Sequence, residues 1–115
     1  MENKELWKET LDLEAPLTIR EKKLEIIRHY GEEHQLDKLI EECSELIQAI
    51  CKWKQNCKED DAIDYLTDLL EELADVENII EQYKLTDGYV NQEVESWKGI
   101  KIERQLERIR GDINA

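Results

Sequence analysis

Two acidic motifs hold the residues whose types and spacing could do chemistry in this chain. Glu42 and Glu45 lie three residues apart in an EExxE run, and Glu72 and Asp75 lie three apart in an ELAD run. Residues at this spacing share one face of a helix. If two such helices pack side by side, four carboxylates converge, and charges of like sign that lie so close require cations. Because Mg²⁺ prefers oxygen ligands, the motifs suggest a metal-dependent reaction on a phosphate-bearing substrate.

The EExxE motif alone is weak evidence. Glutamate makes up 20 of the 115 residues, and chance would produce EExxE in such a sequence with an expectation of roughly one half. Position strengthens the case, because Glu42 and Glu72 border apolar helical stripes on a helical wheel. Uncharged Ala49 and Ile79 continue the same faces. We therefore expect half-buried carboxylates, which are costly unless a metal ion or a cationic side chain pairs with them.

The composition indicates one helical domain. The chain has 115 residues, 40% of them apolar, with one Pro and four Gly. A net charge of −13 disfavours binding to nucleic acid, although a small anionic ligand remains compatible if metal ions and a few cationic side chains meet it. No segment approaches the roughly 20 apolar residues of a membrane span, and the N-terminus lacks a signal-peptide pattern. We therefore expect a cytoplasmic protein with no membrane or nucleic-acid partner.

An arm and a helical domain divide the chain. Residues 1–17 form a weakly patterned N-terminal arm, and residues 18–115 form the domain. The domain's first helix is expected to begin at a capping box made by Thr18 and Glu21. Gly31 is expected to end or kink it.

Three further helices are expected to position the motifs. Apolar spacing predicts them at about residues 35–55, 61–84 and 91–110, and Gly99 is a candidate break in the last. An apolar stripe is expected to face inward on each of the first two of these helices. The stripe of the former contains Leu36, Leu39, Ile40, Cys43, Ile47, Ile50 and Cys51, and that of the latter contains Ile63, Leu66, Leu70, Leu73, Val76 and Ile80.

With both motifs on helices, the chain resembles the MazG-type all-α nucleoside triphosphate pyrophosphohydrolases, a superfamily that includes dimeric dUTPases and dCTPases. EExxE followed by ExxD carries the resemblance, and residues 72–76 (ELADV) match the family's EL(G/A)DV run. Trp53 and Lys54 are similar to a WK pair of several members. Residues 101–104 (KIER) resemble a basic final segment. The resemblance covers about residues 19–110.

The resemblance implies an all-α, four-helix-type bundle that oligomerises through helix packing, as a homodimer or homotetramer. It implies that Glu42, Glu45, Glu72 and Asp75 are metal ligands and catalytic residues that hold Mg²⁺, or Mn²⁺ in its place. The metal would stabilise developing charge and activate a water that attacks the α-phosphate of a (deoxy)nucleoside triphosphate. The products would be a nucleoside monophosphate and pyrophosphate, in a house-cleaning role toward non-standard nucleotides. Which glutamate orients the water stays open.

Five residues are candidates for substrate binding. Lys54, Lys101 and Arg104 would neutralise phosphate oxygens as charge-assisted donors. Lys101 and Arg104 would equally suit an exposed cationic face that pairs with neighbouring glutamates. Trp53 either stacks on a base or packs in an interface. Lys38, one turn before the EExxE pair, either pairs with an acidic ligand or contacts phosphate.

An alternative from another class is a non-catalytic acidic helical binding module. Such a module would mimic nucleic acid toward a basic partner, or sense nucleotides without cleaving them. The net charge of −13 suits this alternative, whereas carboxylates that border apolar stripes argue against it. Thermal melting with Mg²⁺ separates the two, because a true metal site stabilises the fold by mass action.

Overall fold

The structure, a computed structural model, describes residues 16–114. Within this range the chain forms α-helices and no strand, as the sequence predicts. The helices are α1 (Ile19–Tyr30), α2 (Glu32–Asn56), α3 (Ala62–Thr86) and α4 (Gly88–Asn114). None of these helices is long and apolar enough to cross a bilayer. Most of the expected arm lies outside the described residues.

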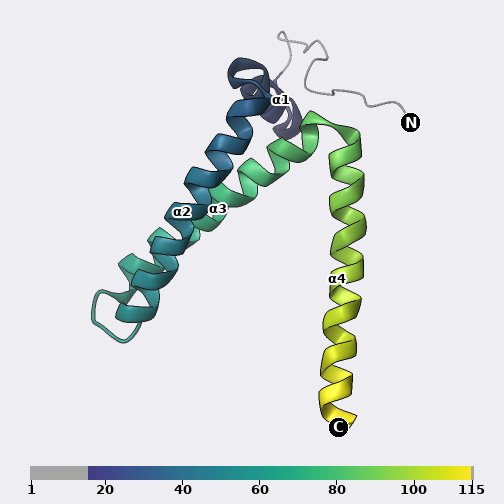
Figure 1. The fold of residues 1–115 in the computed structure, drawn as a ribbon. Helices are drawn as coiled ribbons and strands as arrows, with labels where there is room; N and C mark the ends of the chain where they lie inside the picture. Colours follow the sequence, from purple (N-terminus) through teal and green to yellow (C-terminus); the bar gives the residue numbers. More distant parts are fainter. Residues whose placement is uncertain (1–15, 115) are drawn as a thin grey trace.

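The first helix begins and ends where the sequence predicts. The Thr18 hydroxyl accepts a hydrogen bond from the backbone N–H of Glu21, and the Glu21 carboxylate accepts one from the backbone N–H of Thr18, both at 3.1 Å. This reciprocal pair is a capping box. Gly31 alone joins α1 to α2 and has a φ of 89°, which glycine adopts without steric cost. The chain turns at Gly31, so α1 lies at one end of the α2–α3 pair (Figure 1).

Helices α2 and α3 form the body of the molecule. They run antiparallel, side by side, and are joined by a short loop at residues 57–61 (Figure 1). The buried residues of α2 are Gln35, Glu42 and Ala49. They are seven residues apart, which is nearly two helical turns, so they form one seam along α2. Two of these three residues are polar, and the seam that positions the acidic motifs is therefore largely polar.

The apolar core lies mainly where α1 meets this pair. Leu24 and Ile27 of α1 are buried, together with Val76 and Ile79 of α3. Ala49 adds a smaller contribution further along α2. Ala49 and Ile79, which continue the faces that carry the acidic motifs, are both buried.

The apolar stripes expected to face inward on α2 and α3 face outward for most of their length. Ile40 and Ile47 of α2 are 69% and 62% exposed, and Leu70 of α3 is 55% exposed. Val76 is the buried member of the α3 stripe. The reason is that α2 turns its polar seam, rather than its apolar stripe, toward α3. The stripes are left on the flanks of the pair.

Helix α4 extends away from the other helices. It is continuous, so the candidate break at Gly99 lies inside an unbroken helix. All of residues 91–112 are exposed, including the large apolar side chain of Trp97. The radius of gyration is 18.6 Å, against about 13 Å for a compact domain of this length. In the described part of the chain, α3 and α4 diverge as a V (Figure 1), and the four helices do not close around a common core.

Candidate metal centre

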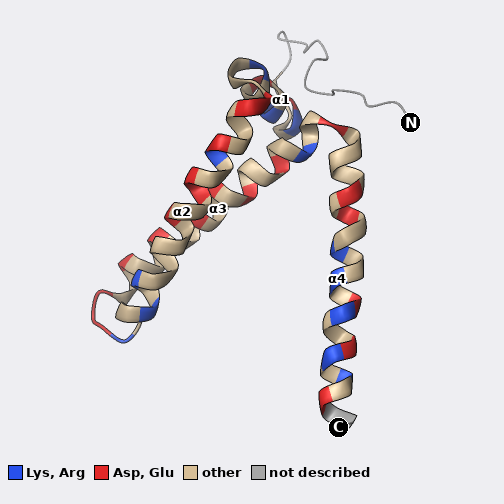
Figure 2. Ribbon diagram, viewed as in Figure 1, with Lys and Arg blue, Asp and Glu red and all other residues tan. Residues whose placement is uncertain are grey.

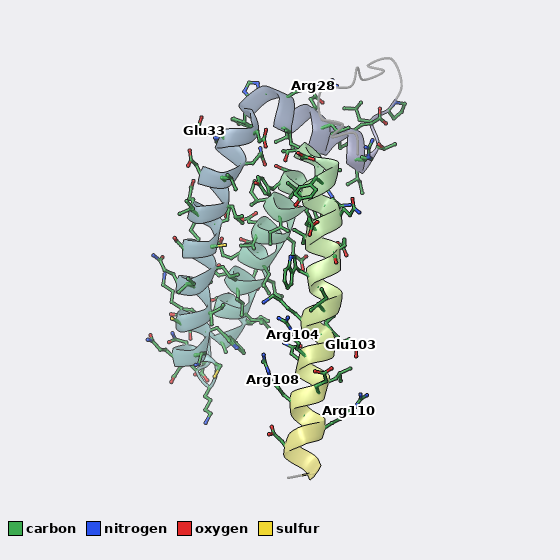
Figure 3. All side chains as sticks on the ribbon, turned by 45° about the vertical axis from the view of Figure 1, so that its right-hand side comes forward. Arg28, Glu33, Glu103, Arg104, Arg108 and Arg110 are labelled. Atoms are coloured by element: carbon green, nitrogen blue, oxygen red, sulfur yellow. The ribbon has the colours of Figure 1, made fainter. Side chains whose placement is uncertain are left out.

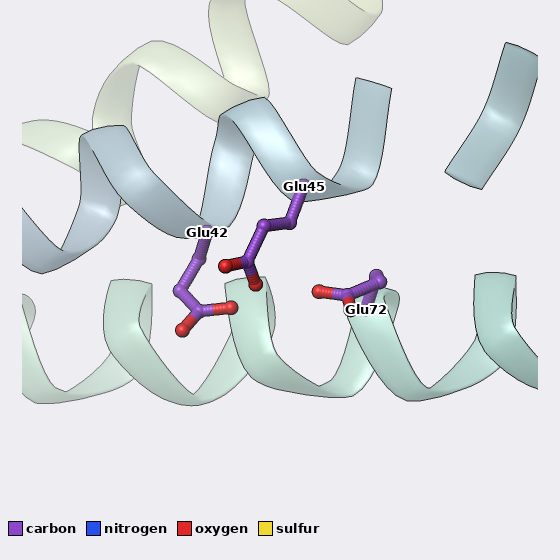
Figure 4. Close-up of side chains that lie close together, drawn as sticks. All are labelled: Glu42, Glu45 and Glu72. Atoms are coloured by element: carbon purple, nitrogen blue, oxygen red, sulfur yellow. The ribbon is translucent and has the colours of Figure 1, made fainter. Parts of the chain in front are cut away.

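Three of the four predicted metal ligands converge between α2 and α3. One carboxylate oxygen from each of Glu42, Glu45 and Glu72 lies within 4.8 Å of the other two. Figure 4 shows the three side chains gathered in the space between the two helices. Glu42 is 6% exposed and Glu72 is half-buried. The three residues, called the carboxylate cluster below, come together because Glu42 belongs to the polar seam and Glu45 follows it on the same side.

Two oxygens of the carboxylate cluster are buried and uncompensated. Neither Oε2 of Glu42 nor Oε2 of Glu72 has a hydrogen-bond partner among residues 16–114. An unsatisfied buried polar atom costs about 1–3 kcal/mol, and a charged one costs more. The other Glu42 oxygen, Oε1, lies 3.2 Å from Nζ of Lys38. The cluster therefore carries more negative charge than its neighbours balance.

The donor set of the cluster fits a hard divalent cation. All three donors are carboxylate oxygens, which Mg²⁺, Ca²⁺ and Mn²⁺ accept. An octahedral Mg²⁺ ion holds adjacent ligands about 2.9 Å apart and opposite ligands about 4.2 Å apart. One oxygen from each of the three glutamates lies within 4.8 Å of the other two, so the three carboxylates would have to draw closer together to share one ion.

Asp75, the fourth predicted ligand, lies beside the cluster. Its side chain is exposed, and it lines a cavity together with Lys38 and Glu42. Asp75 follows Glu72 by one helical turn, so it faces the part of the seam where Lys38 lies. It is therefore adjacent to the three converging carboxylates without being one of them.

Lys38 pairs with the acidic motif, which is one of the two roles that the sequence left open. Its Nζ lies 3.2 Å from Glu42 Oε1 and 3.4 Å from Glu41 Oε1. Hydrogen bonds to Glu42 and then to Glu41 raise the pKa of Lys38 above its usual value of 10.5. Lys38 is thus a permanent cation at neutral pH and balances part of the charge of the cluster.

The two remaining candidates on α2 lie towards its end. Trp53 is half-buried and Lys54 is exposed. Lys54 follows Ile47 by seven residues, so it shares the outward-facing side of the helix. In the described part of the chain, no hydrogen bond or ion pair is recorded between either residue and the carboxylate cluster.

The candidates on α4 form a separate basic surface. Lys101 and Arg104 line a shallow hollow with Arg108, and the Arg104 guanidinium lies 5.9 Å from the ring centroid of Trp97. Figure 3 shows Arg104 and Arg108 on the side of α4 nearer to α2 and α3, with Arg110 on the opposite side. The structure therefore groups the basic residues with each other on α4, apart from the three glutamates.

Three charged residues near the cluster are not among the predicted site residues. Lys52, Asp68 and Glu71 line a hollow of about 160 Å³ together with Glu45 and Glu72. Spacing was the available signal, because Lys52 follows Glu45 by seven residues and Asp68 precedes Glu72 by four. The groove between α2 and α3 therefore continues past the cluster with charges of both signs.

Comparison of the chain with protein-family models, with curated proteins and with solved structures finds no match.

Proposed function

We propose that the protein is a Mg²⁺-dependent nucleotide pyrophosphohydrolase that cleaves a (deoxy)nucleoside triphosphate to the monophosphate and pyrophosphate. The observation that carries the proposal is the convergence of Glu42, Glu45 and Glu72 with two buried carboxylate oxygens that lack partners among the described residues. An all-oxygen donor set favours Mg²⁺, with Mn²⁺ as a substitute. The resemblance of the two acidic motifs to the MazG-type enzymes supports the choice of substrate and of the bond that breaks.

In this proposal the residues near the cluster have different roles in binding the metal ion and the phosphates. Glu42, Glu45 and Glu72 would hold the ion, which when bound polarises phosphoryl oxygens and acidifies a water. Asp75, beside the cluster, would complete the acidic site as ligand or water acceptor. Lys38 holds the Glu42 carboxylate by an ion pair, and it would turn to a phosphate oxygen as a charge-assisted donor once the ion takes over that carboxylate.

Product analysis with a matched pair of variants tests this proposal. The protein is incubated with Mg²⁺ and a panel of nucleoside triphosphates, and the products are separated by ion-exchange chromatography. We expect monophosphate plus pyrophosphate, and a loss of at least about 100-fold in kcat for Glu42→Gln, because it removes a metal ligand. Glu41→Gln is the control, since Glu41 is the exposed neighbour. Diphosphate plus phosphate, absence of turnover, or full activity of Glu42→Gln would contradict the proposal.

A non-catalytic acidic module is the second candidate function. It is favoured by the wide acidic surface, because Asp and Glu side chains recur along α2, α3 and the loop that joins them (Figure 2). Melting temperature as a function of Mg²⁺ concentration separates the candidates. A metal site gives a saturating rise that Glu42→Gln removes, whereas a solvated acidic surface gives a small response that does not saturate and survives the substitution.

We also propose that two copies of the chain associate. Outward-facing apolar residues lie on α2, α3 and α4, including Ile40, Leu70 and Trp97. A chain of 115 residues buries only a small apolar core by itself. A two-fold dimer would bury the same exposed apolar surface on both copies. The basic side of α4 (Lys101, Arg104, Arg108) is complementary to the acidic α2–α3 pair, which favours a second copy as the partner.

A further inference from the structure

A cavity of about 280 Å³ lies where α1, α3 and α4 meet and is called the junction cavity below. Its lining residues come from the first two turns of α1, the last two turns of α3 and the first turn of α4. The chain bends here as α3 gives way to α4 (Figure 1). None of the described lining residues belongs to the carboxylate cluster, so a ligand of this cavity would be separate from the proposed metal site.

Three cationic side chains line the junction cavity, although the chain as a whole has a net charge of −13. Arg20 and Lys23 come from α1, and Lys84 comes from α3. Among the described residues that line the cavity, Glu81 alone is acidic. The local excess of positive charge is therefore opposite in sign to the charge of the chain, and it favours an anion as the ligand.

Two of the three cations are mostly buried and can exchange their partners. The side chains of Lys23 and Lys84 are 21% and 18% exposed, and lysine is seldom buried unless it is paired. Lys23 pairs with Glu81, and Lys84 pairs with Glu95 of α4. Both carboxylates are about half exposed, so each turns to solvent at small cost when an anion takes its lysine.

The third cation and the start of α4 complete the walls of the cavity. Arg20 makes no hydrogen bond or ion pair with another residue of the range 16–114, and its planar guanidinium matches two oxygens of a phosphate. Gly88 begins α4, and a Cβ added there would meet no heavy atom within 4 Å. The backbone at Gly88 is therefore uncovered on that side, and the N-terminus of a long helix adds partial positive charge.

We propose that the junction cavity binds a small phosphate anion, either inorganic phosphate or pyrophosphate. Arg20 would donate in a fork to two oxygens, and Lys23 and Lys84 would donate to the others as charge-assisted partners. The volume lies just below the roughly 300–1,000 Å³ of pockets for drug-sized ligands, which suits an anion of one or two phosphates. The bound anion would bridge α1, α3 and α4 and thereby hold the start of α4. The proposal stands apart from the proposed function, because it needs neither the carboxylate cluster nor a nucleotide.

Binding of phosphate without metal tests the proposal. Inorganic phosphate and pyrophosphate are titrated by calorimetry into the full chain at constant ionic strength with a chelator present. We expect saturable binding by the wild type, and binding at least about 10-fold weaker for Arg20→Gln, which loses a charge-assisted fork. Lys22→Gln is the matched control, because it removes the same charge from an exposed residue of α1 outside the cavity lining. The relative affinities show whether one phosphate or two fill the site.

The acidic residue in the wall gives a second test with the opposite sign. Glu81→Gln removes the competitor for Lys23 and a like charge that faces the anion, so phosphate binding should tighten by about two- to fivefold. Glu77→Gln should leave it unchanged, because Glu77 is an exposed residue one turn earlier on α3 and outside the cavity lining. A variant that merely loosens the fold would not gain affinity.

Hydrogen exchange locates the bound anion on the molecule. Saturating phosphate should slow exchange of the amides of residues 88–92 in the wild type and should leave them unchanged in Arg20→Gln. Unchanged exchange at the start of α4, absence of saturable binding, or equal losses in Arg20→Gln and Lys22→Gln would overturn the proposal. Loss of binding in Arg104→Gln but not in Arg20→Gln would also overturn it, because the basic surface of α4 would then hold the anion.

Discussion

Lys38 and a metal ion would compete for the same carboxylate oxygen. Lys38→Gln removes the cation that lies 3.2 Å from Glu42 Oε1. The variant should therefore bind Mg²⁺ more tightly, by up to about fivefold, since a partly exposed ion pair contributes little. Without Mg²⁺ the variant should melt at a lower temperature, because Glu42 loses its paired cation. A Mg²⁺ titration followed by thermal melting measures both effects, and weaker Mg²⁺ binding would contradict the prediction.

The pKa of Lys38 defines where this competition depends on pH. Its pKa is raised above 10.5, so the stabilisation by the charged form is fully present below pH 10.5 and is lost only as the pH rises through the raised value. Between pH 6 and 9, Lys38 remains a cation, and any change in Mg²⁺ affinity has to come from other groups. Lys54→Gln is the control for Lys38→Gln. Because Lys54 lies on the outward side of α2, its removal should leave the Mg²⁺ affinity unchanged.

At the scale of elements, an ion-pair network helps to hold α4 against α3. Lys84 of α3 pairs with Glu95 of α4, and Lys98 lies 3.3 Å from the same Glu95 carboxylate. Hydrogen bonds from Lys84 and then Lys98 lower the pKa of Glu95 below its usual value of 4.5. A carboxylate with a lowered pKa stabilises the fold above about pH 4.5, and that contribution is lost as the pH falls through the lowered value.

Glu95→Gln should therefore loosen the first turns of α4 at neutral pH. Hydrogen exchange of the amides in residues 89–98 should be faster than in the wild type at pH 7, and the difference should shrink as the pH falls below 4.5. Glu103→Gln serves as the control because Glu103 points away from the other helices (Figure 3). Equal exchange in wild type and Glu95→Gln at pH 7 would show that the pair does not hold the helix.

The ends of the helices could be predicted from the sequence more reliably than the faces they bury. The capping box at Thr18 and the glycine at position 31 are local signals, and both act as predicted. Apolar periodicity shows which side of α2 favours burial, but it does not show whether that side packs against α3 or against another chain. The polar seam through Gln35 and Glu42 was correspondingly hard to foresee. It conflicts with the usual burial of apolar residues, and such conflicts concentrate at functional sites.

The carboxylate cluster was only partly predictable for the same reason. Three-residue spacing placed Glu42 and Glu45 on one face, and the second motif supplied Glu72. Asp75 lies beside the cluster rather than in it because of how α3 is rotated about its own axis relative to α2. Residue spacing within one helix does not predict that rotation. The roles assigned to Trp53, Lys54, Lys101 and Arg104 depend on chain partners or ligands and remain predictions.

At the scale of the whole molecule, the outward apolar stripes predict self-association. The wild-type chain should have a solution mass of at least twice 13.7 kDa by light scattering at micromolar concentration. The double variant Ile40→Glu and Ile47→Glu should have the mass of one chain, because burying two carboxylates in an apolar interface is costly. Gln55→Glu adds charge elsewhere on α2 and should leave the mass unchanged. A monomeric wild type would contradict the prediction.

The short connection between α2 and α3 has a consequence for how the chain tolerates change in length. Gln35, Glu42 and Ala49 repeat every seven residues, and a polar residue within such a repeat can fix the register of paired helices. The short loop at residues 57–61 joins the two helices and so fixes how far α3 is shifted along the axis of α2. Inserting or deleting residues there would shift Glu72 along the groove while both helices stayed helical. The length of this surface loop therefore sets the position of Glu72 relative to Glu42 and Glu45, although no residue of the loop belongs to the carboxylate cluster.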